Sequence, residues 1–213
     1  MNCAALIERV VRIVQDTDFD EDYIKDALNR AMLKIAGGIL RPGSSILTQP
    51  LPELYTIGSS LTSTTSNKIP LPSDYQRGVI MACNSIGAEI QIYNSFQEFV
   101  QTYPLLNYTG QVSAIGIKGR DIYLAGIPAT RETITFHYHR YPVDMTADAD
   151  VPDGLPAEFH DSLLVNYVCR DIFRLKEDGI DGNDFNVQRY DKLFQEGLIE
   201  LDASMPADGA MFR

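Results

Sequence analysis

Two histidines with strand-like spacing are the first residues in this chain that could bind a metal. His137 and His139 lie in the alternating segment ETITFHYHRYP, and both imidazoles share one face because successive side chains of a β-strand point to opposite faces. A zinc site needs at least a third protein ligand and hydrogen-bond partners for the ligating rings. The third histidine, His160, belongs to a different segment. We therefore interpret the pair as strand-surface histidines beside Tyr138 and Tyr141, and we expect no metal site.

Closely spaced aspartates raise the possibility of calcium. Asp18, Asp20 and Asp22 have the first three spacings of an EF-hand loop. Such a loop also needs a glycine at its sixth position and a glutamate at its twelfth, where this chain has Tyr23 and Asn29. We expect Asp18 or Asp20 to cap a helix instead, because an aspartate side chain accepts hydrogen bonds from the first free N–H groups of a helix.

The later aspartates fit structural roles as well. Asp148 and Asp150 begin a second loop of this kind, which also lacks the required glycine and glutamate. Asp178 and Asp181 lie in the segment DGIDGN, and Asp184 follows it. Aspartate next to glycine favours turns and helix N-caps. We expect Asp184 to cap the last helix, and we assign no calcium ligand.

The chain shows no catalytic motif. It contains no GxSxG, HExxH, Walker A or GxGxxG sequence, the patterns that carry nucleophiles, metals or phosphates in many enzymes. Glu158 and Asp161 are close in sequence, but they stand where a helix is expected to begin, and capping accounts for them. We therefore predict no catalytic residues, no cofactor and no enzymatic activity.

The composition is that of a globular protein with an acidic balance. Hydrophobic residues make up 45% and charged residues 22% of the 213 residues, which are ordinary values. The 29 acidic and 18 basic residues give a formal net charge of −11. Neutralisation of nucleic-acid phosphates requires a surplus of Lys and Arg, so we do not expect the chain to grip DNA.

The cysteines and the apolar runs exclude further classes. Cys3, Cys83 and Cys169 are widely separated and odd in number, which argues against a disulfide framework or a zinc knuckle. We expect them to be small core residues in a reducing compartment. No apolar run approaches the roughly 20 residues of a membrane helix, and the start MNCAALIERVV does not have the pattern of a signal peptide.

Both ends of the chain have the apolar periodicity of amphipathic helices. Two such segments stand near the N-terminus, and Gly37-Gly38 ends the second, because glycine favours the left-handed C-cap position. The pattern returns over 161–176 and again over 184–201. Neither pair can bury its apolar stripe alone. We therefore predict one helical subdomain of four main helices, formed by residues 1–40 and 155–204.

The middle of the chain predicts β-structure. GVIMACN and AEIQIYN are short strand candidates, a Lys118-Gly119 turn joins two more, and ETITFHYHRYP is the longest. SFQEFVQTYP predicts one short helix, and the Ser/Thr-rich segment SSLTSTTSNK predicts an exposed loop. The fold class is thus α+β, with a small antiparallel β-sandwich or meander inserted at residues 41–154. Residues 205–213 follow as a flexible tail.

Five segments carry a resemblance to a known family. The chain opens with VVRIVQDTDFDEDYIKDALNRAMLKIAGG and enters the β-region through IPLPSDYQR. The hairpin AIGIKGRDIYLAGIP and the strand ending FHYHRYP come next, and VPDGLPAEFHDSLLVNYVCRDIFRLKED returns to helix. In this order the segments resemble the head-to-tail adaptor, or neck, proteins of tailed double-stranded DNA bacteriophages, over residues 5–200.

The resemblance implies a structural virion protein. Such adaptors form a homo-oligomeric ring, typically a dodecamer, that joins the portal protein to the tail or nozzle protein. DNA passes through the ring without specific binding, and an acidic lumen suits this passage because like charges repel. The implied location is the virion neck, after synthesis in the host cytoplasm, with no membrane. Terminal segments of such rings often dock on the portal, which makes Met205, Met211 and Phe212 candidate portal-binding residues.

Two other classes remain as alternatives. A tail-associated enzyme that acts on cell walls or carbohydrates needs two acids about 5–10 Å apart in a groove. A small assembly chaperone stays a monomer or dimer without affinity for the portal. For an adaptor we expect instead that the isolated protein is monomeric or weakly associated and closes into a ring on the portal.

Overall fold

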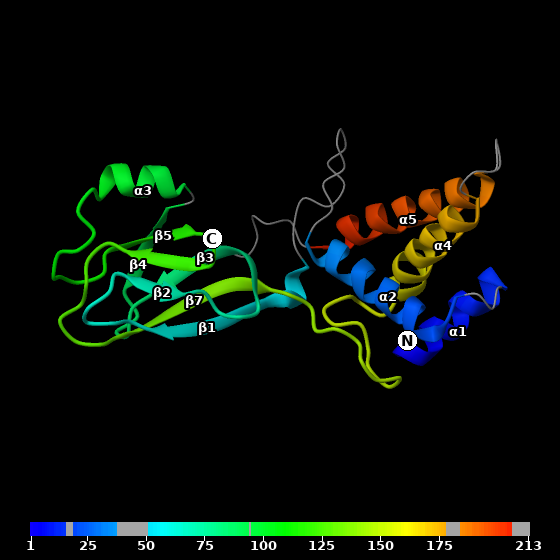
Figure 1. The fold of residues 1–213 in the computed structure, drawn as a ribbon, viewed down its shortest axis with the longest axis horizontal. Coiled ribbons are helices and arrows are strands. Elements are labelled where there is room, and N and C mark those ends of the chain that lie inside the picture. The colour runs from blue at the N-terminus through cyan, green and yellow to red at the C-terminus, as the bar shows by residue number, and fades with distance from the viewer. Residues whose placement is uncertain (16–18, 38–50, 94, 178–183, 206–213) are drawn as a thin grey trace. The chain divides into compact units, whose positions relative to one another are not determined.

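The chain divides into two compact units of different structure. Residues 1–54 together with 142–213 form one, here called the helical unit, and residues 55–141 form the other, called the sheet unit. The fold class is α+β, as predicted (Figure 1). Each unit encloses its own hydrophobic core. The computed structural model describes these parts of the chain: residues 1–15, 19–37, 51–93, 95–177 and 184–205.

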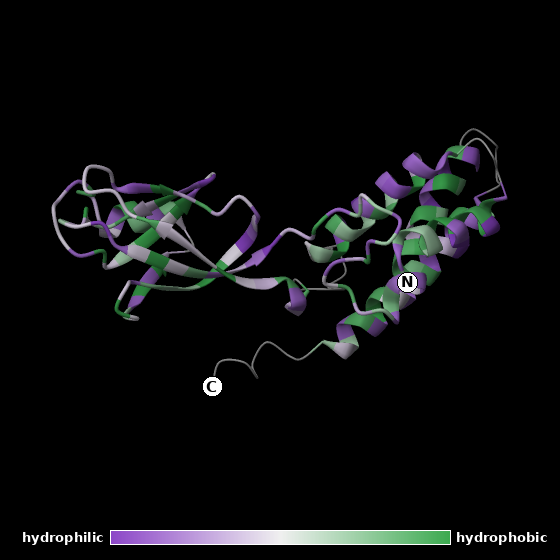
Figure 2. Cartoon of the chain, turned by 90° about the horizontal axis from the view of Figure 1, so that it is seen from below, coloured by the Kyte–Doolittle hydropathy of each residue, from purple (hydrophilic) through white to green (hydrophobic). Residues whose placement is uncertain are grey.

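The described part of the helical unit consists of α-helices joined by shorter helical segments. They are α1 (Cys3–Val14), α2 (Glu21–Ala36), the 3-10 turn η1 (Pro52–Leu54), the π-helical segment η2 (His160–Val165), α4 (Asn166–Glu177) and α5 (Phe185–Ser204). The longer helices have a hydrophobic and a hydrophilic side (Figure 2). In α1, Leu6, Val10 and Val14 recur at helical spacing and are buried. The apolar periodicity of the sequence therefore forms the core of this unit.

Helices α4 and α5 pack against each other through aromatic rings (Figure 1). Tyr167 meets Phe194 edge to face with the ring centroids 5.4 Å apart. Phe173 and Tyr190 stack at the same centroid separation with their planes 8° apart. These ring pairs have preferred geometries, so they help to set the relative orientation of α4 and α5 in addition to burying apolar area. The helix predicted over 161–176 exists, and its first turn is π-helical.

The N-terminus of α5 is capped by a residue that the sequence did not indicate. Asp184 occupies the N-cap position, as predicted, but its side chain makes no capping hydrogen bond. Glu177, from the end of α4, accepts hydrogen bonds from Asn186 Nδ2 at 2.8 Å and from the backbone N–H of Val187 at 3.4 Å. Glu177 is 7% exposed. The predicted capping role of the Asp184 side chain is therefore wrong, and a tertiary contact supplies the cap instead.

The sheet unit contains seven strands and one helix in its described part. They are β1 (Tyr55–Leu61), β2 (Lys68–Pro70), β3 (Tyr75–Cys83), β4 (Glu89–Tyr93), α3 (Phe96–Thr102), β5 (Ala114–Lys118), β6 (Asp121–Leu124) and β7 (Thr133–Arg140). The strand order is β1-β7-β3-β4-β5-β6-β2. The sheet curls. One apolar cluster contains residues from β2 at one edge across to β7, among them Ile69 of β2 and Phe136 of β7.

The sheet is not the all-antiparallel arrangement that we predicted. Strands β4 and β5 pair in parallel, with Ile92 opposite Ile115. Helix α3 lies between them in sequence and covers the sheet (Figure 1). Parallel neighbours need such a crossover, because a tight turn can only return the chain antiparallel. The packing is close: a Cβ on Gly116 of β5 would lie 2.5 Å from Cγ of Phe99.

Two further expectations for the middle of the chain need correction. Part of the Ser/Thr-rich segment is a strand, because β1 runs to Leu61 and pairs with β7 throughout. Thr62, which follows it, is 2% exposed, and its hydroxyl accepts a hydrogen bond from Glu132 N at 2.9 Å. Cys83 is half-buried at the end of β3, whereas Cys3 and Cys169 are core residues as expected.

Candidate functional site

The two strand histidines share one face of β7, as predicted, but their neighbour is not the expected one. Tyr55 of β1 hydrogen-bonds His137 through its hydroxyl, and its ring lies 5.8 Å from that of His137 and 6.1 Å from that of His139. Tyr138 faces the interior, where its hydroxyl donates to Asp74 at 2.7 Å. Burial, followed by this hydrogen bond, raises the pKa of Tyr138 to about 12. His160 belongs to the other unit.

Asp20 and Asp150 accept hydrogen bonds from backbone N–H groups. Asp20 caps α2 by accepting from Tyr23 N at 2.7 Å, while Asp18 lies outside the described residues. The carboxylate of Asp150 accepts from Ala147 N and Thr146 N, both at 2.7 Å. These bonds, that from Ala147 first, lower the pKa of Asp150.

The loop that Asp150 closes caps α1. The backbone carbonyls of Asp148 and Asp150 accept from Ala4 N at 3.1 Å and Cys3 N at 2.7 Å, which are free donors at the start of the helix. The acidic spacing that suggested calcium therefore has a structural purpose here. Within the described residues, no three His, Cys, Asp or Glu side chains are placed to hold a metal ion.

The remaining titratable candidates hold the helical unit together. Asp161 pairs with Arg9 of α1 at 3.2 Å. His160 is 1% exposed, its Nε2 lies 2.9 Å from the carbonyl of Leu155, and its Nδ1 lies 2.9 Å from the amino group of Met1. Nε2 therefore carries the proton and Nδ1 accepts. Burial lowers the pKa of His160, which keeps the ring neutral. No pattern in the sequence predicted that His160 would be a buried structural residue.

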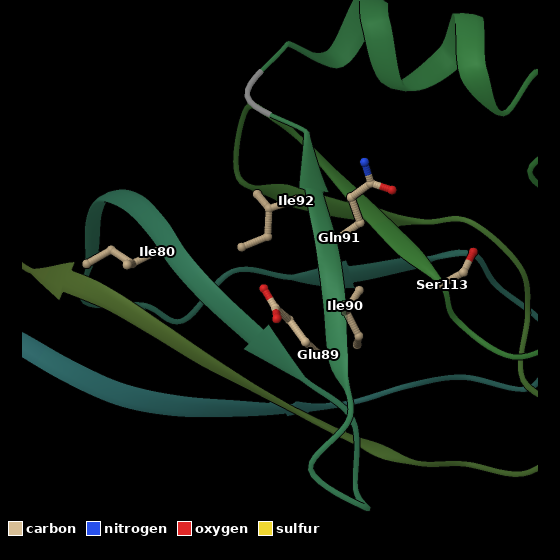
Figure 3. Close-up of a pocket in the computed structure, with 6 residues that line it drawn as sticks. All are labelled: Ile80, Glu89, Ile90, Gln91, Ile92 and Ser113. Carbon is tan, nitrogen blue, oxygen red and sulfur yellow. The ribbon is translucent and has the colours of Figure 1, made fainter. Parts of the chain in front are cut away.

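A shallow depression opens where β3 and β4 separate. The two strands pair only through Ala82–Ile90 and Cys83–Glu89. The depression beyond these pairs has a volume of about 490 Å³, and Figure 3 shows the side chains that line it. Its lining residues are Ile80, Glu89, Ile90, Gln91, Ile92 and Ser113. Glu89 is the one carboxylate among them, so the depression lacks the acid pair that glycoside hydrolysis needs.

Strand β1 has an unusual polarity. Its outward side chains include Tyr55, Ile57 and Leu61, which are 38%, 59% and 57% exposed. Its inward positions carry small residues, including Gly58, where a Cβ would lie 2.9 Å from the ring of Tyr138. We call Tyr55, Ile57 and Leu61 the β1 row. Ile57 and Leu61 are more than half exposed, and large apolar groups on the outer side of a strand indicate a surface that binds something else.

Net charge is divided unequally between the two units. The charged residues of the sheet unit are five acids, Asp74, Glu89, Glu98, Asp121 and Glu132, and six bases, Lys68, Arg77, Lys118, Arg120, Arg131 and Arg140. The helical unit carries the other 24 acidic and 12 basic residues. The formal net charge is thus +1 for the sheet unit and −12 for the helical unit. The net negative charge of the chain therefore belongs entirely to the helical unit.

The described residues expose an apolar row and belong in part to a strongly acidic helical unit. A family model described as SU10 adaptor protein matches residues 1–211. The chain belongs to this SU10 adaptor family and resembles phage head-to-tail adaptors, as the sequence predicted. A search of curated proteins gave no match.

Family membership implies a structural, non-enzymatic role in a phage virion, with portal and tail components as the interacting partners. No described helix combines the length and the apolar character needed to cross a membrane.

The candidate portal-binding residues are only partly visible. Met205 ends α5, where its N–H donates to the carbonyl of Leu201 at 3.1 Å, and its side chain packs against the core of the helical unit. Met211 and Phe212 lie outside the described residues.

Proposed function

We propose that this protein is a ring-forming head-to-tail adaptor that joins the portal to the tail or nozzle and lines the DNA exit channel in the virion neck. The observation that carries the proposal is the family match over 1–211, which takes in both units. The ring is a homo-oligomer, a dodecamer by the resemblance, and the DNA passes through it without specific binding.

The charge distribution supports the channel role. Duplex DNA carries about one negative charge per 1.7 Å of its axis. A surface that is to let DNA slide should repel the phosphates rather than neutralise them. The helical unit, with a formal net charge of −12, meets that requirement and the sheet unit, at +1, does not. We therefore assign the channel lining to the helical unit.

The C-terminal residues are the proposed portal anchor. Met205 already packs against the core of its own chain, so the contribution to docking comes chiefly from Met211 and Phe212. Burial of one such side chain in a groove of the portal contributes about 1.5–3 kcal/mol, less the cost of ordering the segment. Repetition around a ring multiplies this gain into a durable attachment.

Native mass spectrometry of the purified chain, alone and mixed with its portal protein, tests the proposal. We expect a monomer or weak association alone and a closed ring on the portal. Deletion of residues 206–213, which keeps Met205, should leave the melting temperature unchanged and weaken portal docking. A stable dimer with no affinity for the portal contradicts the adaptor role and indicates an assembly chaperone.

A further inference from the structure

The β1 row is the one place in the described chain where three large exposed apolar side chains alternate along a single strand. Tyr55, Ile57 and Leu61 project from the same face of β1. In the described helical unit no helix exposes more than two large apolar side chains, and the two on α5, Phe185 and Ile199, lie near opposite ends of that helix. Ser59 stands between Ile57 and Leu61 on the same face, so the row is a small apolar patch interrupted by one serine.

The row continues across the neighbouring strands as a flat outer face. Ile57 stands opposite His137 of β7, and His137 stands opposite Met81 of β3. Side chains that are directly opposite on adjacent strands lie within contact distance. β1 is also the first strand in the sheet order and pairs only with β7. β1 has no lysine or proline of its own, which often protect an edge strand, but β2 lies near it, where Ser60 Oγ donates to the carbonyl of Pro70 at 3.3 Å.

We propose that the β1 row is the surface on which a second copy of this chain packs, through its sheet unit, in the adaptor ring. This inference rests on the proposed function and adds the location of the contact between subunits. The occupant follows from the charges. Helical units of −12 brought side by side repel each other. Attraction between copies must therefore come from a surface with little net charge and with apolar area to bury, and the sheet unit has both.

The charge division also predicts how salt acts on assembly. The Debye length falls from about 30 Å at 0.01 M salt to about 8 Å at 0.15 M. Salt therefore screens the repulsion between helical units, whereas the apolar contact of the β1 row is not weakened by screening. Self-association through this face should strengthen as salt is raised. A contact built on ion pairs would weaken under the same change.

Two matched variants of the full chain test the location. Ile57→Glu places a charge in the centre of the β1 row. Ile86→Glu makes the same change at a residue that is 82% exposed in the turn between β3 and β4, away from the row. Loss of one buried Ile contact corresponds to about 1.5–3 kcal/mol, so Ile57→Glu should weaken association between copies by more than about tenfold. Ile86→Glu should assemble like the unchanged chain.

The measurements are sedimentation velocity for association between copies and electron microscopy of the chain bound to its portal. Equal melting temperatures of the two variants show that both are folded; if Ile57→Glu melts early, Leu61→Glu replaces it. Normal rings formed by a folded Ile57→Glu variant overturn the inference. Normal rings that lose only tail-protein binding overturn it too and assign the row to the tail protein. If the unchanged chain binds the portal as separate copies, the inference is overturned and the adaptor role stands. If the unchanged chain forms no ring and does not bind the portal, the inference and the adaptor role are both overturned.

Discussion

Removal of the Glu177 side chain should destabilise the helical unit, although Glu177 belongs to none of the proposed binding surfaces. Its carboxylate bridges the end of α4 and the start of α5, with oxygens 2.8 Å from Asn186 Nδ2 and 3.4 Å from Val187 N. The first N–H groups of a helix have no partner within the helix, and a buried donor without a partner is costly. Glu177 supplies that partner and places negative charge at the positive end of the helix dipole.

The size of the effect follows from these contacts. Loss of a helix cap costs about 0.5–2 kcal/mol, and loss of a charge at the helix N-terminus costs about 0.3–1 kcal/mol. Glu177→Ala should therefore lower the free energy of unfolding by about 2 kcal/mol, which corresponds to a fall in Tm of about 4–8 °C for a chain of this size. Glu177→Gln keeps an acceptor but not the charge, and should fall about halfway between.

Asp184→Ala is the matched control. Asp184 stands at the N-cap position, but its side chain makes no capping bond, so its removal should cost less than about 0.5 kcal/mol. Urea unfolding followed by far-UV circular dichroism reports the helical unit, which holds most of the helix. If Asp184→Ala lowers the free energy of unfolding as much as Glu177→Ala does, Asp184 supplies the cap and its assignment to Glu177 is wrong.

Two further substitutions test the packing of the two units, one in the helical unit and one in the sheet unit. His160 is held neutral by burial with a lowered pKa, so its contribution to stability is complete above the unfolded pKa of about 6.5 and is lost as the pH falls below it. His160→Gln should flatten this part of the pH dependence of urea unfolding. Gly116→Ala should destabilise the sheet unit by about 1–3 kcal/mol, because the new methyl group would lie 2.5 Å from the ring of Phe99. An unchanged unfolding midpoint for this variant would show that the ring moves aside at no cost.

The helices could be predicted from the sequence because their signals are local. A helix that buries one side needs apolar residues at a spacing near 3.6, and residues such as Leu28 and Ile35 of α2 follow it into the core. The N-cap Asp20 was also visible, since its partner Tyr23 is three residues away. The cap at the start of α5 was not, because Glu177 reaches that helix only once α4 and α5 are packed.

The strand partners could not be read from alternation. A period of two indicates which side chains share a face, but the same pattern fits either direction of pairing. The parallel pair β4–β5 did leave a trace: a short helix, α3, stands between two strands, which is the order of a right-handed crossover. Strand β1 was hidden for another reason. Its inward positions are small and polar because Tyr138 fills the space over Gly58, so its alternation is inverted relative to a usual half-buried strand.

The candidate binding surfaces could not be predicted from the sequence either, because each depends on the three-dimensional structure. The net charge of −11 was evident, but its division into −12 and +1 depends on the unit boundaries at 54/55 and 141/142. The β1 row required knowledge of which face of β1 is outward. The family, by contrast, could be predicted from the order of the turns and apolar segments.

One basic residue of the helical unit, Arg170, is committed to packing inside the unit. Arg170 lies largely inside, with a side chain that is 18% exposed, and pairs with Asp171 at 2.9 Å and Asp191 at 3.3 Å. Its guanidinium also lies over the ring of Tyr167, 4.4 Å from the centroid. An arginine held in this way stabilises the packing of α4 and α5, but it offers little positive charge to a phosphate outside. The formal net charge of the unit stays at −12, and a surplus of acidic groups suits the proposed channel lining, because it does not hold the phosphates of passing DNA.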